Sequence, residues 1–389
     1  MMVLSNGSIE TKVTFLKEQQ MTETTTPLRI GLVGAGYISA AYLRAARFFG
    51  QMQFVVCADL NPAAAEARAG EFGIESAPLD ALLKDTSIQL VLNLTIPQSH
   101  VPVGLQAVDA GKHVYCEKPL GLSVAEVRPL LDAARLRGVR LGCAPDTFLG
   151  GGQQTARQLI DEGAIGTPIG GTAFVLLPGH ERWHPNPAFY YQPGGGPVFD
   201  MGPYYLTALV NLLGPIGHVV SCGRKGFSQR TIGSGPRQGE RFAVEVQTHF
   251  SVLLEFRSGP VVIFNASFDV QGHSHVPIEI YGSEGTLQVP DPNTFGGPVR
   301  HLSRDGKWRD VALTHGFGNQ NYRGLGVAEM ASALALGVAH RASEVLALHV
   351  LEVMEAIVNG GSTGERIAIQ STVERPRALN PISLLGELN

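Results

Sequence analysis

Cysteine is scarce in this chain of 389 residues, and its four cysteines lie far apart. They are Cys57, Cys116, Cys143 and Cys222, and this spacing contains neither a CxxC metal motif nor a dense disulfide framework. Three of them fall in apolar stretches typical of strands. We therefore expect free, buried thiols, which fit a reducing, cytoplasmic location.

An excess of one charge is also lacking. The formal net charge is −4, from 30 Lys and Arg against 34 Asp and Glu, and no run of basic residues is longer than about a pair. Nucleic acid and anionic membranes need a positive surface, so we expect neither as a partner and predict a small ligand instead. Residues 1–27 contain no long apolar segment, which predicts a mobile tail with the native start at Met1 or Met21.

Hydrophobic residues make up 44% of the chain and charged residues 16%, a balance typical of globular proteins. The length exceeds that of a usual single core, which favours two domains. The 47 glycines indicate many tight turns and close approaches of the backbone to a ligand. We predict a tail over residues 1–27, one domain over 28–145 and a second over 146–389.

The first domain opens with a pattern typical of dinucleotide binding. An apolar strand over residues 28–33 enters Gly34-Ala35-Gly36, and a helix is expected over 40–49. The two glycines permit a tight turn and a close approach of the pyrophosphate, while Ser39 stands where a third glycine is usual. The pattern predicts that Gly34, Gly36, Tyr37 and Ile38 bind the cofactor.

Asp59 ends the next apolar strand, over residues 54–58, roughly twenty residues beyond the glycine turn. A carboxylate there accepts hydrogen bonds from the adenosine ribose and repels a 2′-phosphate, which favours NAD over NADP. A helix-capping role is the alternative. Strands over 90–94, 113–116 and 139–143 then alternate with helices over 100–110 and 124–137, and this alternation predicts an α/β, doubly wound parallel sheet.

The second domain has the turns of an antiparallel sheet. A helix over 153–162 precedes strands over 171–177, 243–256, 261–268 and 278–281, with hairpin turns at 257–260, 282–285 and 304–306. We predict an α+β domain with a large open, mostly antiparallel sheet and helices on one face. Such a sheet leaves its other face uncovered, which favours a homodimer or homotetramer through that face.

Asp200 and Tyr204 follow a glycine-rich segment and are four residues apart. On a helix both would lie on one face, where they can act on one substrate hydroxyl. The alternative is a capping Asp beside a core Tyr.

Three further segments of the first domain are Asn93-Leu-Thr-Ile-Pro-Gln-Ser-His100, Ala110-Gly-Lys-His-Val114 and Glu117-Lys118-Pro119. Together they resemble the glucose-fructose oxidoreductase, inositol dehydrogenase and rhizopine catabolism family. The resemblance implies a Rossmann domain that binds NAD and a sugar-like substrate. It implies that Thr95, Pro97 and His100 line the nicotinamide, and that Glu117 and Lys118 lie beside the reacting centre. It also implies a catalytic segment at Asp200, in which Tyr204 stands at the position of the family's usual histidine.

Oxidation of a secondary alcohol needs a hydride acceptor and a base within hydrogen-bond reach of the hydroxyl. We predict Lys118 as this base, because burial and a nearby nicotinamide would lower its pKa toward neutrality. Without the resemblance, Lys118 would be taken for a surface lysine. Tyr204 is the alternative proton acceptor, and Asp200 would orient the substrate or the base. The residues expected to contact the substrate are Asp146, His180, Trp183, His184, Asp200, Tyr204 and Arg323.

His180-Glu181-Arg182-Trp183-His184 matches the HExxH pattern of zinc hydrolases, which requires a helix. Neighbouring prolines oppose a helix, so we expect a substrate loop and no metal. An ordered surface loop is the simpler alternative, and a zinc hydrolase is the remote one. The leading function is an NAD-dependent sugar, inositol or glycoside dehydrogenase, with oxidation at sugar C3 as the sharper hypothesis. An NADH-dependent keto-sugar or imine reductase and a cofactor-binding regulator without catalysis are the other hypotheses.

Overall fold

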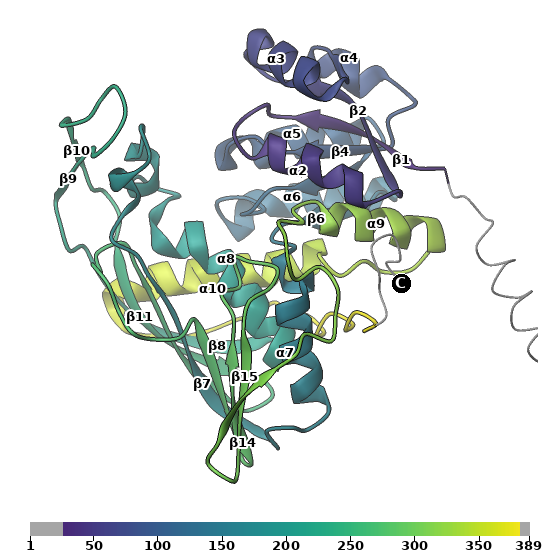
Figure 1. Ribbon diagram of the computed structural model, residues 1–389. Coiled ribbons are helices and arrows are strands. Elements are labelled where there is room, and N and C mark those ends of the chain that lie inside the picture. Colours follow the sequence, from purple (N-terminus) through teal and green to yellow (C-terminus); the bar gives the residue numbers. More distant parts are fainter. Residues whose placement is uncertain (1–25, 382–389) are drawn as a thin grey trace, which may run out of the picture.

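The computed structural model describes residues 26–381. The expected mobile tail over 1–27 and the choice between Met1 and Met21 therefore fall almost entirely outside the described residues. Two sheets dominate the fold, one above the other in Figure 1, with helices lying between them.

The first sheet is parallel and has the strand order β3-β2-β1-β4-β5-β6, which confirms the predicted doubly wound fold. Its strands are β1 (Leu28–Val33), β2 (Met52–Ala58), β3 (Glu75–Ser76), β4 (Leu90–Asn93), β5 (His113–Cys116) and β6 (Leu141–Cys143). The helices around it are α2 (Ser39–Ala45), η1 (Ala46–Phe48), α3 (Pro62–Phe72), α4 (Leu79–Lys84), α5 (Pro97–Asp109) and α6 (Val124–Arg137). Strand order reverses between β1 and β4, and ligands of such sheets bind where the strands end at this point.

The second sheet has nine strands in the order β16-β15-β14-β13-β7-β12-β11-β8-β17. Only the β7–β12 pair is parallel, so the predicted mostly antiparallel sheet is confirmed. The three predicted turns join β11 to β12, β13 to β14 and β15 to β16. Its strands are β7 (Pro168–Leu176), β8 (Ile216–Arg224), β11 (His249–Phe256), β12 (Val261–Ser267), β13 (Ile278–Gly282), β14 (Gly285–Val289), β15 (Val299–Ser303), β16 (Trp308–Val311) and β17 (Arg366–Ala368).

A separate two-stranded sheet, β9 (Gln229–Thr231) with β10 (Arg241–Ala243), projects beyond the end of the large sheet in Figure 1. The sequence pattern instead predicted one long strand over 243–256, of which only the second half forms β11.

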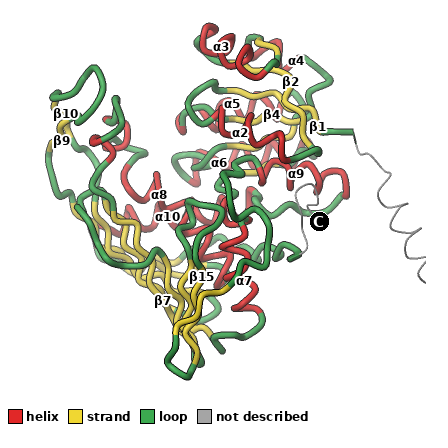
Figure 2. Tube along the Cα trace, viewed as in Figure 1, coloured by secondary structure: helices red, strands yellow, loops and turns green. Residues whose placement is uncertain are grey.

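Helices α7 (Gly151–Asp161), α8 (Gly196–Leu213) and α10 (Glu344–Thr363) cover one face of the large sheet (Figure 2). The alternation on β11 explains this, because Phe250, Val252 and Leu254 are buried toward these helices. Among residues 26–381, α10 is the one helix long and apolar enough to span a bilayer, and it packs on β8 and α8 inside the protein.

The opposite face of the large sheet carries no helix within the described residues. Leu253, Val261 and Ile263 are 43–45% exposed on this face, in the adjacent interior strands β11 and β12. Exposed large apolar side chains on an uncovered sheet face are a surface that a second subunit can cover.

The C-terminal half returns to the first sheet. Helix α9 (Leu325–Leu336) packs on β6 and β2, the amide of Cys143 donates to Ala342 O at 3.0 Å, and Gly142 forms a bridge with Ser343. The predicted division into 28–145 and 146–389 does not anticipate this crossing. The prediction that all cysteines are buried is also wrong for Cys222, which is exposed because its side chain points to the uncovered side of β8; all four thiols are free.

Candidate active site

Three charged or polar side chains from distant segments meet above the ends of the parallel strands. Lys118 follows β5, Asp200 lies in the second turn of α8, and His180 opens the short helix η3 (His180–Arg182) after β7. Lys118 Nζ donates to Asp200 Oδ1 at 3.0 Å and to the Asp200 backbone oxygen at 2.6 Å. His180 Nε2 lies 2.7 Å from Asp200 Oδ2. The Asp200 carboxylate is therefore held from both sides.

The pairing of charges between Lys118 and Asp200 determines the protonation state of both side chains. Burial alone would lower the pKa of Lys118, but Asp200, with Tyr204 and Glu117, outweighs burial and raises it above its ordinary value. Burial would raise the pKa of Asp200, but Lys118 and the bond with His180 hold it well below its usual range. The predicted fall of the Lys118 pKa toward neutrality is thus wrong for this arrangement, because the Asp200 carboxylate lies 3.0 Å from Lys118 Nζ and stabilises the ammonium form.

Tyr204 lies one turn along α8 from Asp200, as predicted. Lys118 Nζ is 5.1 Å from the centre of its ring, and Arg323 Nη2 is 3.4 Å from its hydroxyl. Arg323 also donates to Asn293 Oδ1 at 2.8 Å. The structure therefore brings Lys118, Asp200, Tyr204, His180 and Arg323 into one cluster, at whose centre two cations approach one phenol ring.

The HExxH segment does not have the geometry of a zinc site. Its first residues form only a three-residue turn, and Glu181 points away from the histidines to accept from Arg230 Nη1 at 2.8 Å and from the Tyr191 hydroxyl. Among residues 26–381 no group of three His, Cys, Asp or Glu side chains could hold a metal ion. The zinc hydrolase hypothesis therefore has no support in this loop, where His180 binds Asp200 instead.

Two side chains expected at the ligand surface are structural. Asp146, 1% exposed, accepts from the amides of Gly324 and Gly326 at 2.8 and 3.0 Å, and burial raises its pKa to about 6. The Asp146 carboxylate therefore anchors the start of α9. His100, also 1% exposed, places its ring nitrogens 2.6 Å from Pro119 O and 3.0 Å from Thr95 O, so it supports the wall of the site from behind.

Glu117 has a supporting position as well. Its carboxylate accepts from the Tyr42 hydroxyl at 2.8 Å and from the Lys118 amide at 2.9 Å, which fixes the backbone that carries the lysine. Thr95 caps the end of β4 through a 2.7 Å bond to Asn93 Oδ1, and Pro97 begins α5. These residues shape the edge where β4 and β5 end.

The glycine turn fits a dinucleotide. Gly34 has φ +104°, and a Cβ there would lie 2.6 Å from Leu94 O, so only glycine is accommodated. A Cβ on exposed Gly36 would meet nothing within 4 Å, which leaves open space where a pyrophosphate can approach. Asp59 accepts from the Ala35 amide at 2.7 Å and so lies beside the turn, at the ribose position. Next to this space, Tyr37 is 97% exposed and Ile38 is partly exposed.

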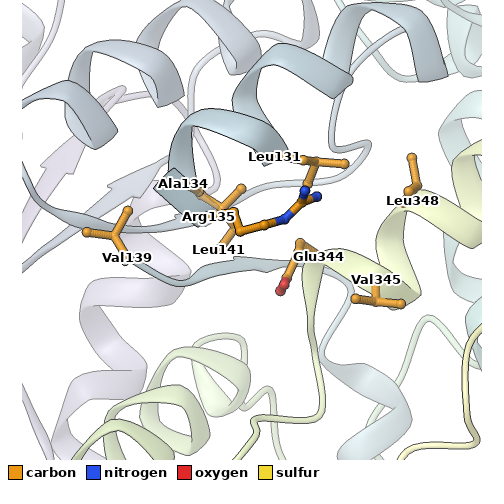
Figure 3. Close-up of a pocket in the computed structure, with 8 residues that line it drawn as sticks. All are labelled: Leu131, Ala134, Arg135, Val139, Leu141, Glu344, Val345 and Leu348. Carbon is orange, nitrogen blue, oxygen red and sulfur yellow. The ribbon is translucent and has the colours of Figure 1, made fainter. Parts of the chain in front are cut away.

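A separate apolar hollow of about 390 Å³ lies between α6 and α10. In Figure 3, Arg135 and Glu344 lie among its apolar lining residues. It contains none of the residues in the cluster around Asp200, so we assign it no part in the chemistry.

Two family models match the chain. One, described as an oxidoreductase family with an NAD-binding Rossmann fold, covers residues 28–144, and the other, the GFO/IDH/MocA C-terminal domain, covers residues 153–288. The chain belongs to the GFO/IDH/MocA family. As a member of this family it is an NAD-dependent oxidoreductase, which confirms the predicted family, fold and cofactor.

Among curated relatives, the chain is 25% identical to a levoglucosan dehydrogenase of Pseudarthrobacter phenanthrenivorans, over 67% of this chain and 73% of that protein. It is 27% identical to a 1,5-anhydro-D-fructose reductase of Ensifer adhaerens, over 67% and 74%. It is 28% identical to an inositol 2-dehydrogenase of Rhizobium meliloti, over the same shares. A solved structure of levoglucosan dehydrogenase has the same fold, with a TM-score of 0.78 at 22% identity over 90% of this chain and 100% of that one.

Sequence reasoning missed several residues of the site. Tyr190 packs on His180 with ring centres 4.3 Å apart, Asn293 holds Arg323, and Arg230 holds Glu181. The run Phe189-Tyr190-Tyr191 beside the glycine-rich segment was a signal for the first. Asn293 and Arg230 had none, because they come from loops and strands whose neighbours only the fold determines.

Proposed function

We propose that the chain oxidises a secondary alcohol of a sugar, inositol or glycoside, at C3 where the substrate is a pyranose. The observation that carries the proposal is the cluster in which Lys118 Nζ, bound to Asp200 at 2.6 and 3.0 Å, lies beside Tyr204 and Arg323. Two cations, a carboxylate and a phenol can donate hydrogen bonds to the hydroxyl groups of a polyol and accept hydrogen bonds from them. The relatives named as sugar and inositol dehydrogenases support this class of substrate.

The cofactor and the residues of the cluster have separate roles in this reaction. When bound, NAD would supply the acceptor for the hydride that leaves the carbinol carbon. Asp200 takes two of the three donor directions of Lys118, so the remaining direction can face the substrate hydroxyl. In its neutral form Lys118 accepts the hydroxyl proton at Nζ. The Tyr204 hydroxyl is the second candidate acceptor, with Arg323 Nη2 3.4 Å away.

One observation favours the reductive direction as a second candidate. The raised pKa of Lys118 keeps its ammonium form at neutral pH, and an ammonium group donates a proton to a carbonyl oxygen during reduction. The relative named as a 1,5-anhydro-D-fructose reductase fits this direction. Rates with NAD and alcohol, compared with rates with NADH and ketone at one pH, distinguish the two directions.

A panel of sugars, inositols and glycosides assayed for NADH formation tests the proposal. We expect at least one polyol to be oxidised, and we expect Lys118→Ala to abolish hydride transfer while NADH still binds, as followed by its fluorescence. Lys84→Ala is the matched control, since Lys84 is an exposed lysine paired with Asp80 on α4. Full activity of Lys118→Ala, or no activity with any polyol, would refute the proposal.

We also propose a homodimer or homotetramer formed through the uncovered face of the large sheet. The exposed apolar side chains of β11 and β12 support it, since burying them removes apolar area from water. Ile263→Lys should lower the molar mass measured by light scattering. Leu136→Lys, an equally apolar exposed position on α6, should not. An unchanged mass for Ile263→Lys would contradict this interface.

A further inference from the structure

An aromatic strip leads outward from the catalytic cluster. We use this name for Trp183, His184, Phe189 and Tyr190, which lie in the loop after β7 and in the short helix η4 (Ala188–Tyr191). Its inner end is Tyr190, whose ring centre is 4.3 Å from that of His180, the partner of Asp200. The ring centre of His184 lies 5.3 to 5.5 Å from the ring centres of Trp183, Phe189 and Tyr190, so the four rings form one continuous surface.

The outer end of the strip is exposed. Trp183 is 60% exposed and Phe189 is 50% exposed, although both are large apolar rings. Tyr190, whose ring centre is 4.0 Å from that of Phe189, is only partly exposed. Exposed aromatic rings that adjoin a reacting centre offer flat apolar faces to whatever extends from that centre.

The strip rests on a rigid base. Arg230 of β9 pairs with Glu181 at 2.8 Å and with Asp269, and the Tyr191 hydroxyl donates to Glu181. The Gly233 amide donates to Glu181 O at 2.7 Å, which joins the loop to the β9–β10 sheet. All three charged side chains are at most 11% exposed, so this ion-pair network holds the loop in place before any ligand binds.

We propose that the aromatic strip is a second subsite, which binds the non-reacting ring of a glycoside while the oxidised ring lies at Lys118 and Asp200. This inference rests on the proposed function and narrows its substrate class from polyols in general to two-ring glycosides. The apolar face of a sugar ring and an aromatic aglycone both stack on such a surface. A single-ring polyol held at the cluster would leave Trp183 and Phe189 uncovered.

Substrates matched in the oxidised ring test the subsite. The full-length protein is assayed with methyl β-D-glucoside, phenyl β-D-glucoside and cellobiose, and NADH formation gives kcat/KM for each. We expect both two-ring compounds to exceed the methyl glucoside, and phenyl glucoside compared with cellobiose distinguishes an aromatic from a sugar occupant. In Trp183→Ala and Phe189→Ala, the ratio of two-ring to methyl glucoside should fall roughly two- to tenfold, the range for one lost aromatic contact.

The controls separate this inference from the function on which it rests. Leu136→Ala, at an 87% exposed position on α6, should leave the ratio unchanged. Oxidation of the methyl glucoside or of an inositol with no gain from a second ring would overturn the subsite and leave the dehydrogenase intact. No oxidation of any polyol would overturn both. A change of oligomeric mass in Trp183→Ala without a change in the ratio would show that a neighbouring subunit covers the strip, and would also overturn the subsite.

A binding measurement makes the test independent of turnover. The chain has two tryptophans, and the other, Trp308, lies on the edge strand β16. In Trp308→Phe, Trp183 is the sole tryptophan reporter. Cellobiose should change its emission at lower concentration than methyl β-D-glucoside does. Equal concentration dependence for the two sugars, or no change with either, would contradict binding at the strip.

Discussion

Replacing Asp200 by asparagine should shift the pH dependence of alcohol oxidation to lower pH. Lys118 must lose a proton before it can accept one from the substrate, so the rate of oxidation rises as pH approaches its pKa. The carboxylate raises that pKa, and its removal therefore lets the neutral amine form at lower pH. The direction of the shift follows from the sign of the lost charge alone.

The size of the shift follows from the geometry. Two unit charges 3.0 Å apart interact by about 5.5 kcal/mol at an effective dielectric constant of about 20. The amide keeps a dipole, and the backbone oxygen of residue 200 still accepts from Lys118 at 2.6 Å, so we expect roughly half of this energy to be lost. About 3 kcal/mol corresponds to a shift of about two pKa units.

The assay is kcat/KM for NADH formation from the best polyol, measured from neutral to strongly alkaline pH. Asp305→Asn is the matched control, because Asp305 also pairs with a cation, Arg309, but lies in an exposed turn of the large sheet. Its profile should coincide with that of the unmodified protein. If Asp200→Asn retains the original alkaline limb, Lys118 is not the base whose ionisation this limb reports, which would refute its assignment as the proton acceptor.

Three further predictions concern the cofactor turn and His180. Gly34→Ala should lower the free energy of unfolding by roughly 1–3 kcal/mol in denaturant unfolding, since φ at this residue is +104°. Gly36→Ala should leave the free energy of unfolding unchanged and weaken NADH binding in a fluorescence titration. Asp59→Ser should raise KM for NAD roughly tenfold and improve use of NADP; an unchanged cofactor preference would contradict the ribose assignment. His180→Ala should lower kcat more than it raises KM, and it should move the acid limb of the pH–rate profile to higher pH, because the Asp200 carboxylate loses a hydrogen-bond donor. His180→Gln should restore much of kcat and of the original acid limb. Equal losses in His180→Ala and His180→Gln would argue against a role of His180 in positioning Asp200.

Much of the first domain was predictable from the sequence. The strands Leu28–Val33 and His113–Cys116 and the helix Val124–Arg137 begin and end where the pattern predicted, because fully buried parallel strands are short apolar runs. The spacing of Asp200 and Tyr204 also predicted their common helix face. Local periodicity is enough for these features.

The rest depended on contacts between segments far apart in the chain. The pairing of Lys118 with Asp200 joins residues 82 positions apart, and it reverses the expected change in the lysine pKa. Asp146 was expected to contact the substrate, but its carboxylate accepts from the amides of Gly324 and Gly326, about 180 positions along the chain. No local pattern indicates which distant backbone will approach a buried acid.

The return of α9 to the parallel sheet has a consequence for how the two halves can be separated. The chain crosses between them near residue 145 and again before α9 and after it, where Ala342 and Ser343 pair with β6. A fragment cut after residue 145 would expose the apolar side of β6 and β2 that α9 covers, and should aggregate or fail to fold. Separating the nucleotide half from the sheet half would also break the hydrogen bond from the Cys143 amide to Ala342 O and the bridge between Gly142 and Ser343, so these contacts oppose separation of the two halves.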